Sequence, residues 1–184
     1  MFPEDTRQLY RLFADVLDYP DSSSAGVAEE CLQKLEISFP DSAKPMRTFV
    51  DYTHSQSLGT LEEVYTKTFD TVPDRTLYVG YQLFGENPKR STFLVRLEEA
   101  FQAQEFSRGS ELADHLPVLL RFLSVAEEPE FAIPLLQECL LPVLDKIEGD
   151  FKKDKTGYGA SVRSLKRFLK TVSGSLEKTG GLAG

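Results

Sequence analysis

The sequence predicts an all-α protein, a single-domain helical bundle of about eight helices. Apolar residues recur at helical spacing along nearly the whole chain, and no segment has a convincing partner for a β-strand. A chain of 184 residues with 41% hydrophobic residues, including 13 Phe and 7 Tyr, can bury a large core. We expect residues 1–178 to form this domain and residues 179–184 to be a flexible tail.

Four helices are expected in the N-terminal part of the chain. The first has a regular apolar stripe and ends before Pro20, the second covers about 24–36, and the third covers about 44–57. A capping box at Thr60–Glu63 predicts the start of the fourth, because the threonine hydroxyl can accept a hydrogen bond from the glutamate amide. The inward side chains of the fourth helix are Leu61, Val64, Tyr65 and Phe69.

The middle of the chain alternates turns and helices. Residues 70–76 form a loop with a Pro–Asp turn signal, and residues 89–104 form an amphipathic helix. The stretch between them, 77–85, suits either a short strand or a buried helix. We expect a helix there, because no partner strand is visible elsewhere. A further helix is predicted over 111–126, with Asp114 near its N-cap.

Two helical regions are expected after residue 128. A long apolar helix follows Pro129, and Pro142 should kink or split it, because proline lacks the amide hydrogen that an α-helix needs. A charged connection over 150–160 leads to the last helix, which covers about 160–173. The residues expected on the outer face of this last helix are Arg163, Lys166, Arg167 and Lys170.

Charge is distributed unevenly along the chain, whose formal net charge is −8. Residues 1–150 hold 13 Lys and Arg against 27 Asp and Glu, whereas residues 151–184 hold 8 against 2. An acidic body argues against nucleic-acid binding and suits a basic peptide partner through electrostatic steering. A solvated acidic surface without any partner has the same composition.

The sequence favours a cytoplasmic protein without stable membrane insertion. No apolar run approaches the roughly 20 residues that span a bilayer. The N-terminus carries Glu4 and Asp5, where a secretory signal would be positively charged. Cys31 and Cys139 belong to no CxxC pair, and we expect two small buried apolar residues rather than a disulfide.

The common motifs of catalysis and cofactor binding are missing from the sequence. It contains no dinucleotide-binding GxGxxG, P-loop, GxSxG, HExxH or EF-hand motif. Two His and two Cys, all far apart, are too few for a metal site of the usual kind. We therefore expect a protein that is not an enzyme, with no catalytic residue, no metal and no cofactor.

Two groups of residues could recognise a ligand. In Glu111–Pro117, a carboxylate and an imidazole meet at a helix start, where Asp114 could cap the helix and hold His115 in one tautomer. The same two side chains could instead only hydrogen-bond locally. The second group is aromatic, and suits either peptide anchoring or core packing. Its members are Tyr65, Phe69, Tyr78, Tyr81 and Phe84.

Four segments together resemble one known family. Leu9–Pro20 ends in Leu-Asp-Tyr-Pro, Leu61–Asp70 resembles a Tyr-x-x-x-Phe-Asp helix, and Tyr81–Asn87 resembles the turn that follows that helix. Ser110–Leu123 is similar to an Asp-His-Leu-Pro stretch and is the most specific of the four, although Ala113 stands where proline is frequent. The family is the NarJ/TorD family of redox enzyme maturation chaperones, which includes the nitrate reductase delta subunits.

The resemblance implies a chaperone. Members of this family bind the N-terminal segment, often a twin-arginine leader, of the apo catalytic subunit of a molybdoenzyme until its molybdenum cofactor is inserted. In related chaperones the Asp-His region helps to bind that segment. The peptide-binding residues implied here are Glu111, Asp114, His115, Leu116, Pro117, Tyr78, Tyr81, Phe84 and Gly85.

Two alternative functions fit the same residues. One is a helical adaptor or regulator that shares only the fold, because fold does not determine function. The other is a small hydrolase-like enzyme that would use Asp114 and His115, for which the sequence offers no nucleophile. The sequence leaves the choice of client enzyme open, and it is compatible with a monomer or a dimer.

Overall fold

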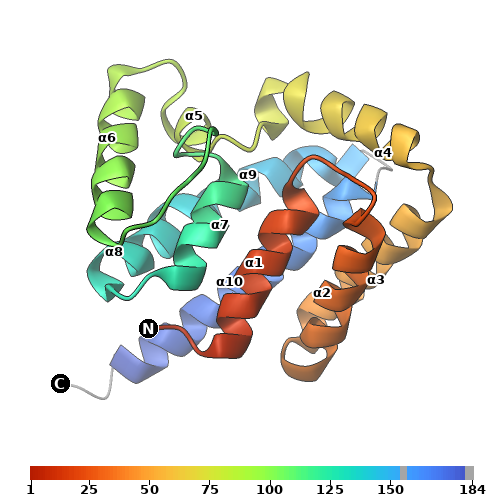
Figure 1. Cartoon of the computed structure of the whole chain (residues 1–184), viewed down its shortest axis with the longest axis horizontal. Coiled ribbons are helices and arrows are strands. Elements are labelled where there is room, and N and C mark those ends of the chain that lie inside the picture. Colours follow the sequence, from red (N-terminus) through yellow and green to blue (C-terminus); the bar gives the residue numbers. More distant parts are fainter. Residues whose placement is uncertain (154–156, 181–184) are drawn as a thin grey trace.

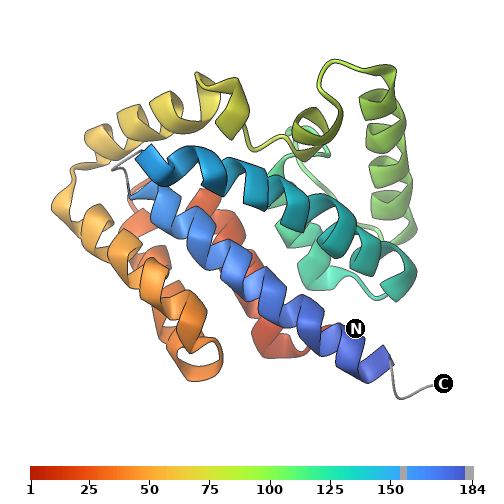
Figure 2. The same ribbon diagram turned by 180° about the vertical axis from the view of Figure 1, so that it is seen from behind.

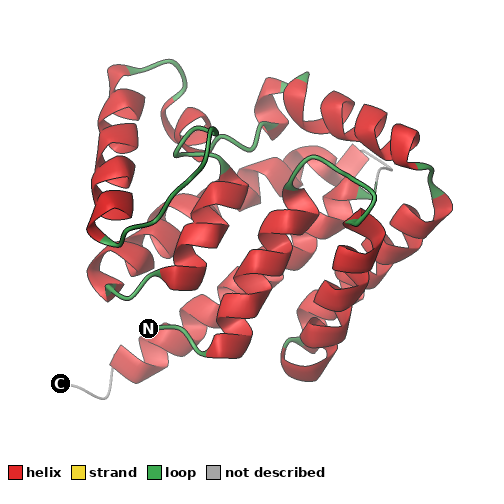
Figure 3. Ribbon diagram, viewed as in Figure 1, coloured by secondary structure: helices red, strands yellow, loops and turns green. Residues whose placement is uncertain are grey.

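The chain folds into a bundle of helices (Figures 1 and 3). The computed structural model describes residues 1–153 and 157–180, and within these ranges no β-strand occurs, which confirms the predicted all-α class. The α-helices are α1 (Glu4–Leu17), α2 (Ser24–Ser38), α3 (Pro40–Ser55), α4 (Leu58–Tyr65), α5 (Val79–Phe84), α6 (Pro88–Ala103), α7 (Leu116–Val125), α8 (Pro129–Pro134), α9 (Leu141–Asp150) and α10 (Tyr158–Gly180). Shorter helical segments are the π-helices η1 (Thr66–Asp70) and η3 (Leu135–Leu140) and the 3₁₀ turns η2 (Pro73–Arg75) and η4 (Phe151–Lys153).

The bundle is arranged around α1 and α10. Helix α1 packs between α7 and α2, and α3 packs between α2 and α10. Seen from behind in Figure 2, α10 runs diagonally across the molecule, with α3 on one side and α9 on the other. Helix α6 stands at one edge of the bundle and packs chiefly on α5.

Aromatic side chains fill the centre of the bundle. Phe168 of α10 is fully buried, and its ring centroid lies 5.3 Å from that of Phe13 and 4.9 Å from that of Phe39. Near the other end of α10, the Tyr158 ring lies 5.5 Å from Tyr65 and 5.4 Å from Phe69. Since these rings come from α1, the junction of α2 and α3, α4 and η1, the two clusters join α10 to most of the N-terminal half.

The start of α4 corrects one expectation. The N-cap is Ser57, whose Oγ accepts a hydrogen bond from the Thr60 amide at 3.2 Å, so Thr60 lies inside the helix and does not cap it. Serine is at least as good an N-cap as threonine, and capping three residues earlier adds most of a turn. The expected burial of Tyr65 and Phe69 is confirmed.

Two expected helices begin later than predicted. Leu77 lies in a bend and Tyr78 is extended, and only Val79–Phe84 is helical in the stretch for which we expected a helix over 77–85. The helix expected over 111–126 begins at Leu116. Both differences have one cause, because Tyr78 and His115 pair as an isolated antiparallel β-bridge, which neither segment indicates alone.

The C-terminal third differs from expectation in three respects. The apolar region after Pro129 is helical without a break to Asp150, so Pro142 does not split it; the helix instead changes from α8 to the π-helix η3 and then to α9, with Pro142 in the first turn of α9. Helix α10 is longer than expected at both ends and includes residues 179 and 180 of the predicted tail, while 181–184 lie outside the described residues. The predicted outer face is also partly wrong, because Lys166 is only 18% exposed and pairs with Asp145.

We expect Phe168→Ala to lower the free energy of unfolding by about 3–5 kcal/mol, because it leaves a cavity among tightly packed rings. Urea-induced unfolding followed by circular dichroism measures this change. The matched control is Ile37→Ala on α2, where the side chain is 83% exposed and the change should stay within about 0.5 kcal/mol. Equal effects of the two substitutions would contradict a central role for Phe168.

Candidate functional site

A single β-bridge brings the two predicted recognition segments together. The amide of Val79 donates to the carbonyl of Asp114 at 2.8 Å, and the amide of Leu116 donates to the carbonyl of Leu77 at 2.8 Å. Tyr78 and His115 therefore lie opposite each other, with ring centroids 5.0 Å apart. The aromatic residues around Tyr78 and the segment Glu111–Pro117, which the sequence offered as two separate groups, therefore form one site.

His115 is the N-cap residue of α7, although its side chain makes no capping bond. Its ring is largely buried, and loss of solvation lowers the pKa of His115 below its usual value despite the opposing charge of Glu111. The Nδ1 atom lies 4.0 Å from a Glu111 carboxylate oxygen. The imidazole is therefore neutral at neutral pH, and it presents an apolar face to Tyr78 with one polar edge toward Glu111.

Glu111 and Tyr78 are linked directly. The Tyr78 hydroxyl donates to Glu111 Oε1 at 3.0 Å, and the Leu112 amide donates to the same oxygen at 2.8 Å. Burial, together with this hydrogen bond, raises the pKa of Tyr78 to about 12. Tyr78 therefore stays protonated, and Glu111 presents a half-exposed carboxylate beside an aromatic ring.

Asp114 has a different role from the expected N-cap. Its side chain is fully buried and accepts from Arg90 of α6, with Nε–Oδ2 at 3.0 Å and Nη2–Oδ1 at 3.3 Å. No side-chain hydrogen bond to the α7 amides occurs. Sequence reasoning missed Arg90. A buried carboxylate requires a cationic partner, but the linear sequence does not indicate which arginine supplies it.

The remaining predicted residues divide into half-buried and buried ones. Tyr81 is half-buried, whereas Phe84 packs against Phe93 of α6 with centroids 5.8 Å apart. Gly85 ends α5 with a φ of 61°, a backbone conformation that glycine adopts without strain. Leu116 and Pro117 are buried in the core, so in this structure they frame the site and do not present side chains to a ligand.

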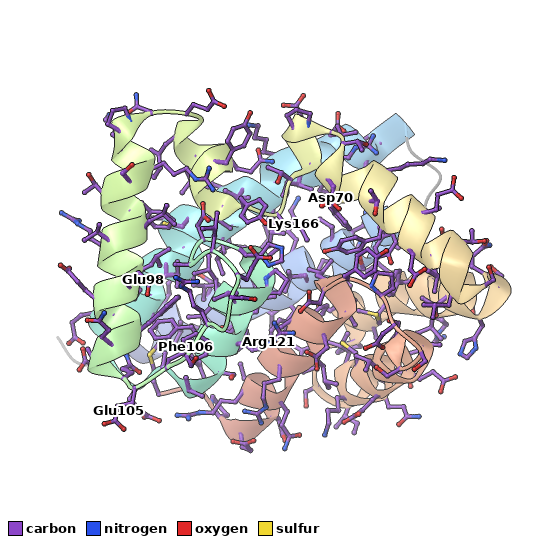
Figure 4. The ribbon with its side chains drawn as sticks, turned by 45° about the horizontal axis from the view of Figure 1, so that its top comes forward. Asp70, Glu98, Glu105, Phe106, Arg121 and Lys166 are labelled. Carbon is purple, nitrogen blue, oxygen red and sulfur yellow. The ribbon has the colours of Figure 1, made fainter. Side chains whose placement is uncertain are left out.

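The surface has a hollow beside Tyr78 of the bridge and a second one between α1 and α2. One, of about 210 Å³, is lined by Asp70, Val72, Pro73, Thr76, Tyr78, Tyr81 and Arg90. The other, of about 300 Å³, lies between the end of α1 and the start of α2 and is lined by three aspartates and by Arg121. The Arg121 Nη2 atom donates to Asp15 and to Asp18 at 2.8 Å each. Figure 4 shows Asp70 at the end of η1 and Arg121 on α7.

The surface around the bridge is acidic and aromatic. The carboxylates of Glu111, Asp18 and Asp114 each favour the protonated form of His115 and so oppose the lowering of its pKa by burial. Tyr19 is 53% exposed and packs edge-on against Tyr65. Within the described part of the chain, no group of three or more His, Cys, Asp or Glu side chains could hold a metal ion.

The fold and this surface define a helical bundle with a candidate peptide-binding site. The chain belongs to the nitrate reductase delta subunit family, whose family model matches residues 38–140. The matched region extends from the start of α3 to the end of η3 and includes the bridge and both recognition segments.

Two known proteins illustrate the relationship. The chain is 27% identical over 125 residues to a probable nitrate reductase molybdenum cofactor assembly chaperone, NarJ, of Bacillus subtilis (strain 168), covering 67% of this chain and 68% of that protein. A crystal structure of an Archaeoglobus fulgidus protein, proposed there to act in redox enzyme maturation, has a TM-score of 0.62 and 21% sequence identity. That similarity covers 89% of this chain and 93% of the other, and it supports the fold.

Family membership identifies the chain as a maturation chaperone, and it confirms the expectation that the protein is not an enzyme. The hydrolase alternative is thereby removed. Among the described helices, none is both long enough and apolar enough to cross a bilayer.

His115 should make stability depend on pH. Because its pKa is lowered by folding, the unfolded chain binds more protons below about pH 6.5, so stability falls as the pH drops through this value. We expect wild type to lose more unfolding free energy than His115→Gln between about pH 7.5 and pH 5.5. Urea unfolding at both pH values measures the difference, and equal losses would contradict a buried neutral imidazole.

Gly80 should be intolerant of a side chain. A methyl group at this position would lie 2.6 Å from Asp114 Oδ2, so Gly80→Ala should destabilise the protein by about 1–3 kcal/mol. Thermal unfolding measures this loss. Gly59→Ala in α4 is the control, because nothing lies within 4 Å and alanine favours a helix. If the Gly80→Ala protein were as stable as the control, the close contact between the Gly80 backbone and the Asp114 side chain would be contradicted.

Proposed function

We propose that this chaperone binds the N-terminal segment of an apo molybdoenzyme catalytic subunit, of nitrate reductase or a related enzyme, and assists molybdenum cofactor insertion. The observation that carries the proposal is the Tyr78–His115 bridge. It joins the rings of Tyr78 and Tyr81, which we call the aromatic platform, to Glu111 and the start of α7. The related NarJ protein of Bacillus subtilis is described as a molybdenum cofactor assembly chaperone of nitrate reductase, which supports this choice of client class.

The chemistry of the surface suits a segment that is both basic and apolar. Glu111 and Asp70 supply negative charge near Tyr78 and Tyr81, whose rings can pack against aliphatic stems or cationic groups. Leu112 adds a side chain that is 46% exposed. A peptide with arginine or lysine next to apolar residues would satisfy both kinds of group, as a leader segment does.

The mechanism is binding without turnover. An extended or disordered client segment becomes ordered on the chaperone, and the entropy lost in ordering keeps the affinity moderate. Moderate affinity allows release once the client has folded around its cofactor. We place this activity in the cytoplasm, in a single chaperone domain of residues 1–178 that acts as a monomer or a dimer.

The first test is an affinity pulldown with the folded chain from its native host grown on an anaerobic electron acceptor, followed by mass spectrometry. We expect recovery of an apo molybdoenzyme catalytic subunit. If that subunit is present in the lysate but not retained, the proposal fails. Retention of a different stable partner would instead favour the helical adaptor.

Charge neutralisation tests the site itself. We expect Glu111→Gln with Asp70→Asn to weaken binding of a synthetic client N-terminal peptide about tenfold, because two nearby carboxylates are lost while their shapes are kept. Isothermal titration calorimetry measures the affinity, and the difference should shrink in about 0.5 M salt. The control is Glu130→Gln, an exposed acid of α8. Equal affinity of the double variant and the control would remove these acids from the site.

A further inference from the structure

Asp114 cannot touch a ligand in this structure. Its side chain is 0% exposed, and both carboxylate oxygens accept from Arg90. The hypothetical methyl group on Gly80 would lie 2.6 Å from Oδ2, so the α5 backbone closes that side. Its side chain can therefore influence a client only indirectly, and Arg90 is the residue that hydrogen-bonds to both of its oxygens.

Arg90 in turn contacts the aromatic platform. Its guanidinium carbon lies 5.8 Å from the Tyr78 ring centroid and 5.9 Å from the Tyr81 centroid. Both distances are within the range of cation–π attraction. The guanidinium also lines the hollow beside Tyr78 and Tyr81, so one planar group contacts the buried carboxylate and the two rings of the surface.

Arg90 also anchors α6. This helix packs chiefly on α5, at the edge of the bundle, and Arg90 lies in its first turn. The pair with Asp114 thus ties α6 to the strand-like segment that carries His115. A bidentate arginine fixes geometry more strictly than a lysine, because its planar fork matches the two carboxylate oxygens.

We propose that Arg90 is the positioning residue of the peptide site, and that Asp114 acts through it by holding the guanidinium against Tyr78 and Tyr81. The proposal rests on the peptide-binding function proposed above. It assigns Asp114 no direct contact with the client and makes Arg90, which lies in neither of the two predicted recognition segments, part of the same functional unit.

A double-mutant cycle tests this coupling. The variants are Arg90→Lys, Asp114→Asn and the double variant, and the readout is calorimetric affinity for a synthetic client N-terminal peptide. If the two residues act as one unit, each single variant loses about tenfold and the double loses no more than either. Additive losses of about a hundredfold would overturn the proposal, because they would mean that Asp114 acts independently. Tighter binding by Arg90→Lys would also overturn it, since Arg90 would then compete with the client.

Ring NMR of tyrosine-labelled protein gives a second readout that does not depend on the client. We expect Arg90→Lys and Asp114→Asn to shift the signals of Tyr78 and Tyr81 in the same direction while leaving the buried Tyr10 unchanged. Arg96→Lys, an exposed site on the same helix, is the control and should shift neither ring.

The two readouts separate the two proposals. If the wild-type chain binds no client peptide, the proposed function fails, while the ring shifts still decide whether Arg90 positions the tyrosines. If the peptide binds but the Tyr78 and Tyr81 signals match the wild type in both variants, the positioning role is wrong and the peptide-binding function stands.

Discussion

The recognition surface depends on two backbone hydrogen bonds. They join Leu77–Val79 to Asp114–Leu116, and without them the aromatic segment and the acid–imidazole segment would be separate loops. Buried amides and carbonyls at such a junction must be paired, because an unpaired one costs as much as a lost hydrogen bond. The two hydrogen bonds that pair these backbone groups therefore also fix the distance between Tyr78 and His115.

The buried ion pair adds a second constraint at the same place. A carboxylate removed from water is tolerated only with a well-placed partner, and Arg90 supplies one with two hydrogen bonds. The Arg90 guanidinium also lies over the rings of Tyr78 and Tyr81. The same group therefore both neutralises the Asp114 carboxylate and contacts the two rings. Glu111, by contrast, stays half-exposed, and its charge remains directed toward solvent and toward Tyr78.

Local patterns predicted most of the helices and the acidic character of the surface. The apolar spacing indicated the buried faces that Tyr65 and Phe69 occupy. The start expected for α7, at residue 111, was five residues too early, although the N-cap expected near Asp114 lies at the next residue, His115. Two features of the site depend on contacts between segments that are distant in the sequence. The strand character of Tyr78 depends on His115, and the partner of Asp114 lies on a different helix, so neither is encoded by nearby spacing.

The bridge also closes the base of a loop that contains α5, α6 and the turns around them. The far end of α6 is held by Phe101 and Phe106, whose rings pack on Phe122 of α7. Since the ends of residues 79–114 meet at fixed positions, the connection after Phe106 can change in length at little entropic cost. Insertions or deletions there would leave the register of Tyr78 and His115 intact, provided that Arg90 keeps its place in the first turn. Such a loop can diversify in evolution while its base is preserved.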